Sequence, residues 1–193
     1  LAASGLGEAR RAVAALRAWD FKWAATSVPT ALAVAWGETA WANVAPEARA
    51  GRMAVQEGIA RATPAQKLAA LEEAIERLKR DFGRWDTPWG EINRFQRLNN
   101  AITASFDDSA PSFPVPFTSA QWGSLASFGA KRYPNTKKVY GSNGNSFVAV
   151  VEFGPRVRAR AVTAGGESGD ASSRHFRDQI ERYAKGELNQ IVR

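Results

Sequence analysis

The 193-residue sequence has no cysteine and only one histidine, His175. The lack of cysteine excludes disulfides, thiolate zinc sites and a cysteine nucleophile, but it leaves both a cytosolic and a periplasmic location open. The single histidine excludes a multi-histidine metal site within the chain. No apolar run is as long as a transmembrane helix, and the phosphate-binding loop and dinucleotide motifs are missing.

The composition is that of a folded, basic chain. Hydrophobic residues make up 45% of it, enough for a substantial core, and the formal net charge is +7. Although a basic chain suggests nucleic-acid binding, the basic residues are spread along the sequence and mixed with acids, as in Glu72–Arg84. We therefore expect one domain, or a large piece of one, with neither nucleic acid nor a membrane as partner and without a metal or other cofactor.

Residues 1–84 are predicted to form a helical segment, because apolar residues recur there at helical spacing. The clearest helix begins at Thr63, which has the capping-box spacing to Gln66. Four stretches follow the helical pattern: Leu6–Trp23, the apolar stretch capped by Ser27, residues 46–62 with a break at Gly51, and the stretch from Thr63 to Gly83.

Residues 85–193 are predicted to contain a loop-rich segment, then strands, then a final helix from His175 to Lys185. Ser146–Phe153 is an apolar, β-branched run bounded by turn residues, which indicates a buried strand. Arg156–Thr163 alternates arginine with apolar residues and pairs with that strand through a short Gly-Pro turn. Helices in the first half and an antiparallel sheet in the second indicate the α+β class.

The loop-rich segment is unusually aromatic. Its rings either cover an apolar ligand or, more ordinarily, contribute to the core. They are Trp85, Trp89, Phe95, Phe113, Phe117 and Trp122.

Glu152 is the one ionisable residue in the strand Ser146–Phe153. Since side chains alternate across a strand, it shares a face with Val148 and Val150, where a carboxylate needs a partner. One interpretation is a strand-end acid that meets water or an arginine, for which Arg156 and Arg158 are close candidates. The other is a carboxylate that orients a catalytic side chain. The pattern alone does not decide between them.

Ser168, His175 and Asp178 lie close in sequence and are the residue types of a serine triad. The nucleophile-elbow spacing is missing around Ser168, and triads are defined by geometry and not by proximity along the chain. We therefore predict that these residues do not form a triad, and that His175 belongs to the first turn of the last helix.

The runs GSNGNSFVAVVEFG and VRARAVTAGGESGDASSRHFRDQIERYAKGEL resemble the carboxy-terminal part of the β subunit of penicillin-acylase-type N-terminal-nucleophile hydrolases. Within that superfamily the chain is most similar to the cephalosporin (glutaryl) acylases and the acyl-homoserine-lactone acylases. SVPTALAVAWGE, DTPWGEINRFQR and SFPVPFTSAQWGSLASFGAKRYP fit the same region. The similarity is specific over Trp85–Leu188 and looser before Arg61.

The resemblance implies an amidase of αββα sandwich fold that is made as a precursor, cleaved autocatalytically and exported to the periplasm. In such enzymes the serine at the amino end of the β subunit is the nucleophile and its free α-amine is the base, with preplaced donors for the oxyanion. Residue 1 is leucine here. We therefore expect a fragment that lacks the nucleophile and is inactive alone, with the α subunit and the remainder of the β subunit as its partners.

One catalytic role transfers by resemblance. In the cephalosporin acylases a glutamate matching Glu152 orients the histidine that assists the serine, and here that histidine would lie outside the chain. The sequence departs from the family at Arg174, where proline is frequent, and it stops at Arg193, before the aromatic tail that the family leads us to expect.

The leading hypothesis is a fragment of an acylase that hydrolyses the side-chain amide of an N-acylated small molecule, such as a β-lactam antibiotic or a quorum-sensing acyl-homoserine lactone. Residues 1–84 and 85–193 would both belong to one larger β-subunit domain. The alternative is a non-catalytic basic α+β binding module.

Overall fold

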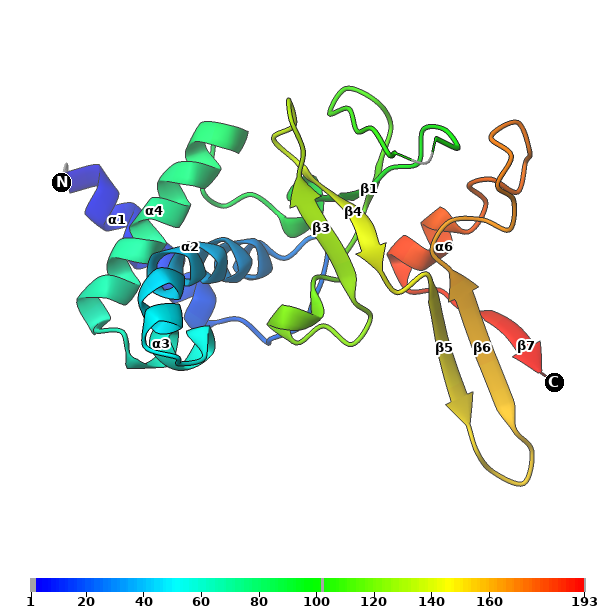
Figure 1. Cartoon of the computed structure of the whole chain (residues 1–193), viewed down its shortest axis with the longest axis horizontal. Coiled ribbons are helices and arrows are strands. Elements are labelled where there is room, and N and C mark those ends of the chain that lie inside the picture. The colour runs from blue at the N-terminus through cyan, green and yellow to red at the C-terminus, as the bar shows by residue number, and fades with distance from the viewer. Residues whose placement is uncertain (1–2, 102, 193) are drawn as a thin grey trace. The chain divides into compact units, whose positions relative to one another are not determined.

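The computed structural model describes residues 3–101 and 103–192, so the expectations for Leu1 and Arg193 lie outside the described residues. The chain forms two compact units (Figure 1). The described residues of 3–22 and 27–88 form the first unit, and those of 23–26 and 89–192 form the second. In the described part of the chain, no helix is both long and apolar enough to cross a membrane.

The first unit is built from helices, as predicted. Its core lies between the second and fourth helices, where Leu32 and Ile75 are almost fully buried. Arg77 of the fourth helix donates hydrogen bonds to the Ala35 carbonyl and to the Glu38 carboxylate, at 3.1 and 2.9 Å. The four helices are α1 (Ala3–Arg17), α2 (Val28–Ala50), α3 (Val55–Arg61) and α4 (Pro64–Phe82).

Two helix boundaries in the first unit differ from the prediction. α1 ends at Arg17 and not at Trp23, because the Asp20 carboxylate accepts the Lys22 N–H at 3.0 Å and Phe21 takes a left-handed φ of 59°. Residues 46–50 belong to α2, which continues through Pro46. The helix expected over 46–62 is therefore wrong, and only Val55–Arg61 forms a separate helix.

The capping box at the start of α4 is confirmed. Gln66 N–H donates to the Thr63 hydroxyl at 3.2 Å, and Thr63 N–H donates to the Gln66 side chain at 2.8 Å. Both bonds satisfy amide groups that have no partner within the helix. Gly83 ends α4 in a left-handed conformation, as the sequence predicted.

We predict that Thr63→Ala lowers the free energy of unfolding of the first unit by about 1 kcal/mol, because the helix loses its side-chain acceptor. Thr63→Ser is the matched control, since it keeps the hydroxyl and should stay within about 0.5 kcal/mol of the parent. Urea denaturation followed by circular dichroism measures both changes. Equal losses in the two variants would contradict a capping role.

The second unit contains two sheets. One has the strand order β2-β1-β4-β3, with β1 parallel to β4 and the other pairs antiparallel, and the second has the order β5-β6-β7 and is antiparallel throughout. The α+β class is thereby confirmed. The elements are α5 (Trp89–Ile92), β1 (Asn93–Phe95), β2 (Phe113–Pro114), a 3₁₀ turn (Ala120–Trp122), β3 (Phe128–Arg132), β4 (Val139–Gly144), β5 (Phe147–Glu152), β6 (Arg158–Thr163), α6 (Ile180–Lys185) and β7 (Asn189–Val192).

The core of the second unit surrounds Tyr183, which is 1% exposed. Its ring makes edge contacts with Phe95 and Phe117, at centroid distances of 6.0 and 5.6 Å. The other buried members of the cluster are Val115, Phe128, Val162 and Ala184. The ordinary interpretation of the aromatic segment is thus confirmed for the phenylalanines, since they pack within the chain's own core.

Candidate functional site

Glu152 lies at the end of β5, on the hairpin of residues 147–163 that we call the β5–β6 arm (Figure 1). The register places Glu152 directly opposite Arg158, and the carboxylate is 4.0 Å from the guanidinium. Both side chains are largely exposed, at 69% and 75%. This arrangement matches the first interpretation, a strand-end acid beside an arginine, and it leaves the carboxylate oxygens accessible to a further donor.

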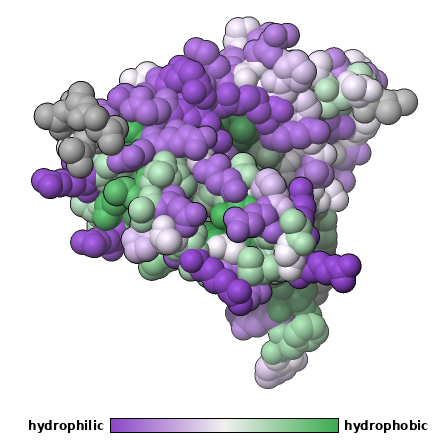
Figure 2. Space-filling model, turned by 60° about the vertical axis from the view of Figure 1, so that its left-hand side comes forward, coloured by the Kyte–Doolittle hydropathy of each residue, from purple (hydrophilic) through white to green (hydrophobic). Residues whose placement is uncertain are grey.

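The predicted strand pairing is confirmed, but the predicted burial of the valine face is wrong for Val150, whereas Val148 is half-buried and packs against the core around Tyr183. Val150 is 50% exposed, and Figure 2 shows apolar side chains gathered on the arm. The register explains the exposure, because Val150 and Glu152 face Arg160 and Arg158, so the valines share their face with two cations. The opposite face carries Ala149 and Val151 and is also open.

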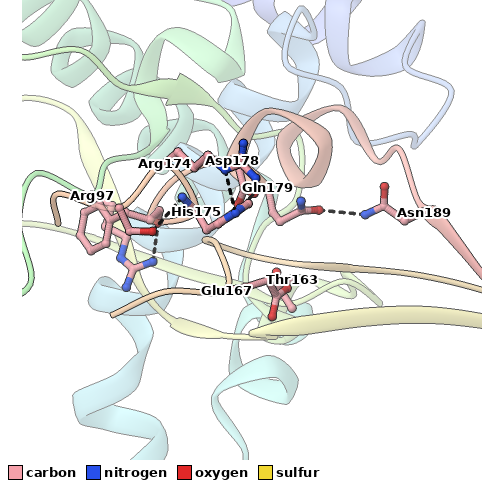
Figure 3. A network of polar contacts seen from close by, with 10 residues as sticks. Arg97, Thr163, Glu167, Arg174, His175, Asp178, Gln179 and Asn189 are labelled. Atoms are coloured by element: carbon pink, nitrogen blue, oxygen red, sulfur yellow. Dashed lines mark hydrogen bonds and ion pairs between the residues drawn. The ribbon is translucent and has the colours of Figure 1, made fainter. Parts of the chain in front are cut away.

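A loop of residues 164–179 follows β6 and is held from a distant part of the sequence by Arg97. The guanidinium donates to the Phe176 carbonyl at 2.7 Å and to the Ser168 carbonyl at 3.3 Å (Figure 3). It also stacks over the Phe176 ring, 3.9 Å from its centroid. Phe176 is 1% exposed, so this stack anchors the loop to the core.

His175 and Asp178 form a pair within this loop. The imidazole Nδ1 lies 2.8 Å from the Asp178 carboxylate, and Nε2 accepts a hydrogen bond from Arg174 Nε at 2.9 Å. Since Nε2 is an acceptor, the proton is on Nδ1 and is donated to Asp178. Figure 3 shows His175 between its two partners.

The Ser168 hydroxyl takes no part in that pair. It accepts the Asp170 N–H at 3.1 Å, while both ring nitrogens of His175 are engaged by other side chains. The structure therefore brings together two of the three residues considered as a triad, and the serine is directed elsewhere.

His175 is not in a helix, so this part of the prediction is wrong. α6 begins only at Ile180. The Asp170 carboxylate accepts from Ser172 N–H and the Ser173 hydroxyl accepts from His175 N–H, and such local bonds compete with helix formation. The two bonds from Ser172 also lower the pKa of Asp170, which keeps the carboxylate ionised as their acceptor.

Asp107 and Asp108 accept hydrogen bonds that the sequence pattern did not predict. Tyr140 is fully buried and donates its hydroxyl to Asp108 at 2.9 Å. Burial, followed by this hydrogen bond, raises the pKa of Tyr140, so the phenol remains a donor. The Asp107 carboxylate accepts the Ser109 hydroxyl and N–H, and these bonds lower its pKa. Asp108 therefore ties the 106–110 loop to β4, and Asp107 stabilises the turn within that loop.

Arg97 is the residue that sequence reasoning missed. Its partners are backbone carbonyls 71 and 79 residues away, and no side-chain pattern in the sequence predicts these contacts.

Among the described residues there is no group of three or more histidine, cysteine, aspartate or glutamate side chains that could hold a metal ion.

Comparison with known protein families matches residues 2–193 to the penicillin amidase family. The match covers nearly the whole chain and agrees with the mixed α+β fold of helices and antiparallel sheets. It also implies amide hydrolysis as the general activity of full-length members. The chain belongs to the penicillin amidase family of N-terminal-nucleophile hydrolases.

Proposed function

We propose that this protein acts as an acylase that removes the acyl side chain of a small N-acylated molecule, either a β-lactam or an acyl-homoserine lactone. The observation that supports the proposal is the family match over residues 2–193. The reaction joins water to the amide carbon, breaks the C–N bond and releases a carboxylic acid and an amine. The alternative is a non-catalytic basic α+β binding module, which the family match does not favour.

Glu152 is the residue of this chain that we assign to the reaction, as a positioning residue. Its carboxylate is exposed, and its nearest cation, Arg158, stands at 4.0 Å, the outer limit of an ion pair. The carboxylate can therefore accept a hydrogen bond from an imidazole N–H supplied by another part of the protein. Such a bond fixes the tautomer and ring orientation of a histidine.

The nucleophile in this proposal is a serine that carries a free α-amine, supplied by the rest of the β subunit after autocatalytic cleavage of a precursor. Within the described chain, His175 is occupied by Asp178 and Arg174, and the Ser168 hydroxyl accepts from Asp170 N–H. His175 therefore does not activate the Ser168 hydroxyl as a nucleophile. The partners would be the α subunit and the remainder of the β subunit, and the location would be the periplasm.

The proposal is tested by measuring amine release from two substrates, glutaryl-7-aminocephalosporanic acid and N-octanoyl-homoserine lactone. Fluorescamine detects the primary amine that amide hydrolysis produces, whereas opening of the lactone or β-lactam ring does not yield it. We expect the processed full-length protein to release amine from one of them. No release from either substrate would contradict the proposal.

A further inference from the structure

The second unit contains a groove of about 810 Å³, a size typical of small-molecule sites. Its wall is formed by the end of β1, the end of β4 with the turn after it, and the start of the 164–179 loop. We call it the Arg97 groove. All its lining residues belong to the second unit.

The charged side chains that line the Arg97 groove are of one sign, positive. Among the described residues that line it, Arg97 is the only one with a charged side chain, and no aspartate or glutamate is present. The hydrogen bonds that Arg97 makes go to the carbonyls of Phe176 and Ser168, and no carboxylate of the described chain forms an ion pair with it. A partly buried guanidinium with only neutral partners favours an anion, and a planar carboxylate matches its geometry.

The rest of the wall is aromatic and amide in character. Four phenylalanine rings contribute apolar surface: Phe95, Phe106, Phe128 and Phe147. Phe106 is itself fixed by stacking on Tyr140, with ring centroids 4.9 Å apart. Asparagine side chains at positions 99, 100, 143 and 145 provide neutral hydrogen-bonding groups. A cation beside rigid rings suits a ligand with one acidic end and one flat apolar end.

We propose that the Arg97 groove binds a small organic carboxylate whose body is an aromatic ring. The carboxylate pairs with the free N–H groups of the Arg97 guanidinium, and the ring packs among the phenylalanine side chains. This binding depends on residues of the described chain alone and does not require hydrolysis. Failure of the acylase assay would leave it standing, and failure of binding would leave the acylase proposal standing.

The probe for this site is 3-phenylpropionate, with the neutral 3-phenylpropanamide as its isostere. Isothermal titration calorimetry is expected to give saturable binding of the acid with a Kd on the order of 1 mM or below. The amide is expected to bind about tenfold more weakly, because it loses the charge-assisted pair with Arg97. Equal affinities for acid and amide, or no saturation by about 10 mM acid, would overturn the proposal.

Gly169 provides matched variants that leave Arg97 and its anchoring bonds untouched. A Cβ atom added at Gly169 meets no atom within 4 Å, and the residue follows Ser168, whose carbonyl Arg97 holds at 3.3 Å. Gly169→Asp would add a carboxylate to the lining of the groove, one residue from the carbonyl that Arg97 holds, and is expected to weaken binding of 3-phenylpropionate by about tenfold or more. Gly169→Asn has the same shape without the charge and is expected to bind as the parent does. The same loss in both variants would contradict the assigned ligand class.

Discussion

Replacing Glu152 with glutamine in the full-length protein is expected to leave it folded and to lower kcat by roughly one to three orders of magnitude. Glutamine keeps the size and one acceptor of the side chain but removes its charge. In the role proposed for Glu152, the imidazole would then lose the partner that fixes its tautomer and stabilises its positive form. Steady-state kinetics at saturating substrate measures the change, and kcat should fall more than KM rises.

A pH profile separates this positioning role from a structural one. A carboxylate beside a histidine raises the pKa of the imidazole, so its removal lowers that pKa. Because the histidine of the proposed mechanism would assist the serine in its neutral form, the acidic limb of the kcat profile is expected to move to lower pH in Glu152→Gln.

Arg158→Gln is the control for Glu152→Gln. It removes the charge opposite Glu152 on the neighbouring strand and leaves the carboxylate in place. We expect it to change turnover little, because an exposed pair at 4.0 Å contributes at most about 1 kcal/mol. Full turnover in Glu152→Gln, or equal losses in both variants, would assign Glu152 to the ordinary strand-end role.

The features that the sequence predicted correctly depend on neighbouring residues. Ser27 accepts from Thr30 N–H as a helix cap, and Thr63 and Gln66 cap α4 reciprocally. The pairing of β5 with β6 also follows from local pattern, since a short turn joins two runs with strand periodicity. In each case the physical cause acts over a few residues, which a single sequence displays directly.

The features that were missed depend on contacts between distant residues. An apolar strand such as β5 predicts burial, but the pattern does not say whether its cover comes from the same chain, and here Val150 is 50% exposed. Arg97 donates hydrogen bonds to two backbone carbonyls of the 164–179 loop. The sequence pattern predicted a helix for part of that loop, and no helix forms there before Ile180. Local side-chain bonds at Asp170 and Ser173 outweighed that propensity over residues 175–179.

Replacing Tyr183 with alanine is expected to have the largest effect on the stability of the second unit, about 3–5 kcal/mol, as for other large aromatic residues truncated in a core. The ring is 1% exposed and touches Phe95, Phe117 and Phe128. Its removal opens a cavity among them that short side chains nearby cannot fill. Urea unfolding followed by tryptophan fluorescence measures the loss.

Tyr183→Phe is the matched control and isolates the contribution of the ring. The Tyr183 hydroxyl is buried without a hydrogen-bond partner among the described residues, and burial raises its pKa to about 12. Because an unpaired buried hydroxyl does not stabilise the fold, Tyr183→Phe should be neutral or slightly stabilising at pH 7.

In the parent, the raised pKa makes the folded state hold its proton more tightly than the unfolded chain, whose tyrosine titrates near 10. Below about pH 10 the hydroxyl is neutral in both states and the parent keeps its full stability. That stability falls as the pH rises from about 10 towards 12, because the folded state resists ionisation of the buried phenol, so Tyr183→Phe should unfold less readily than the parent in that range. A loss above about 1 kcal/mol in Tyr183→Phe at pH 7 would mean that the hydroxyl has a partner.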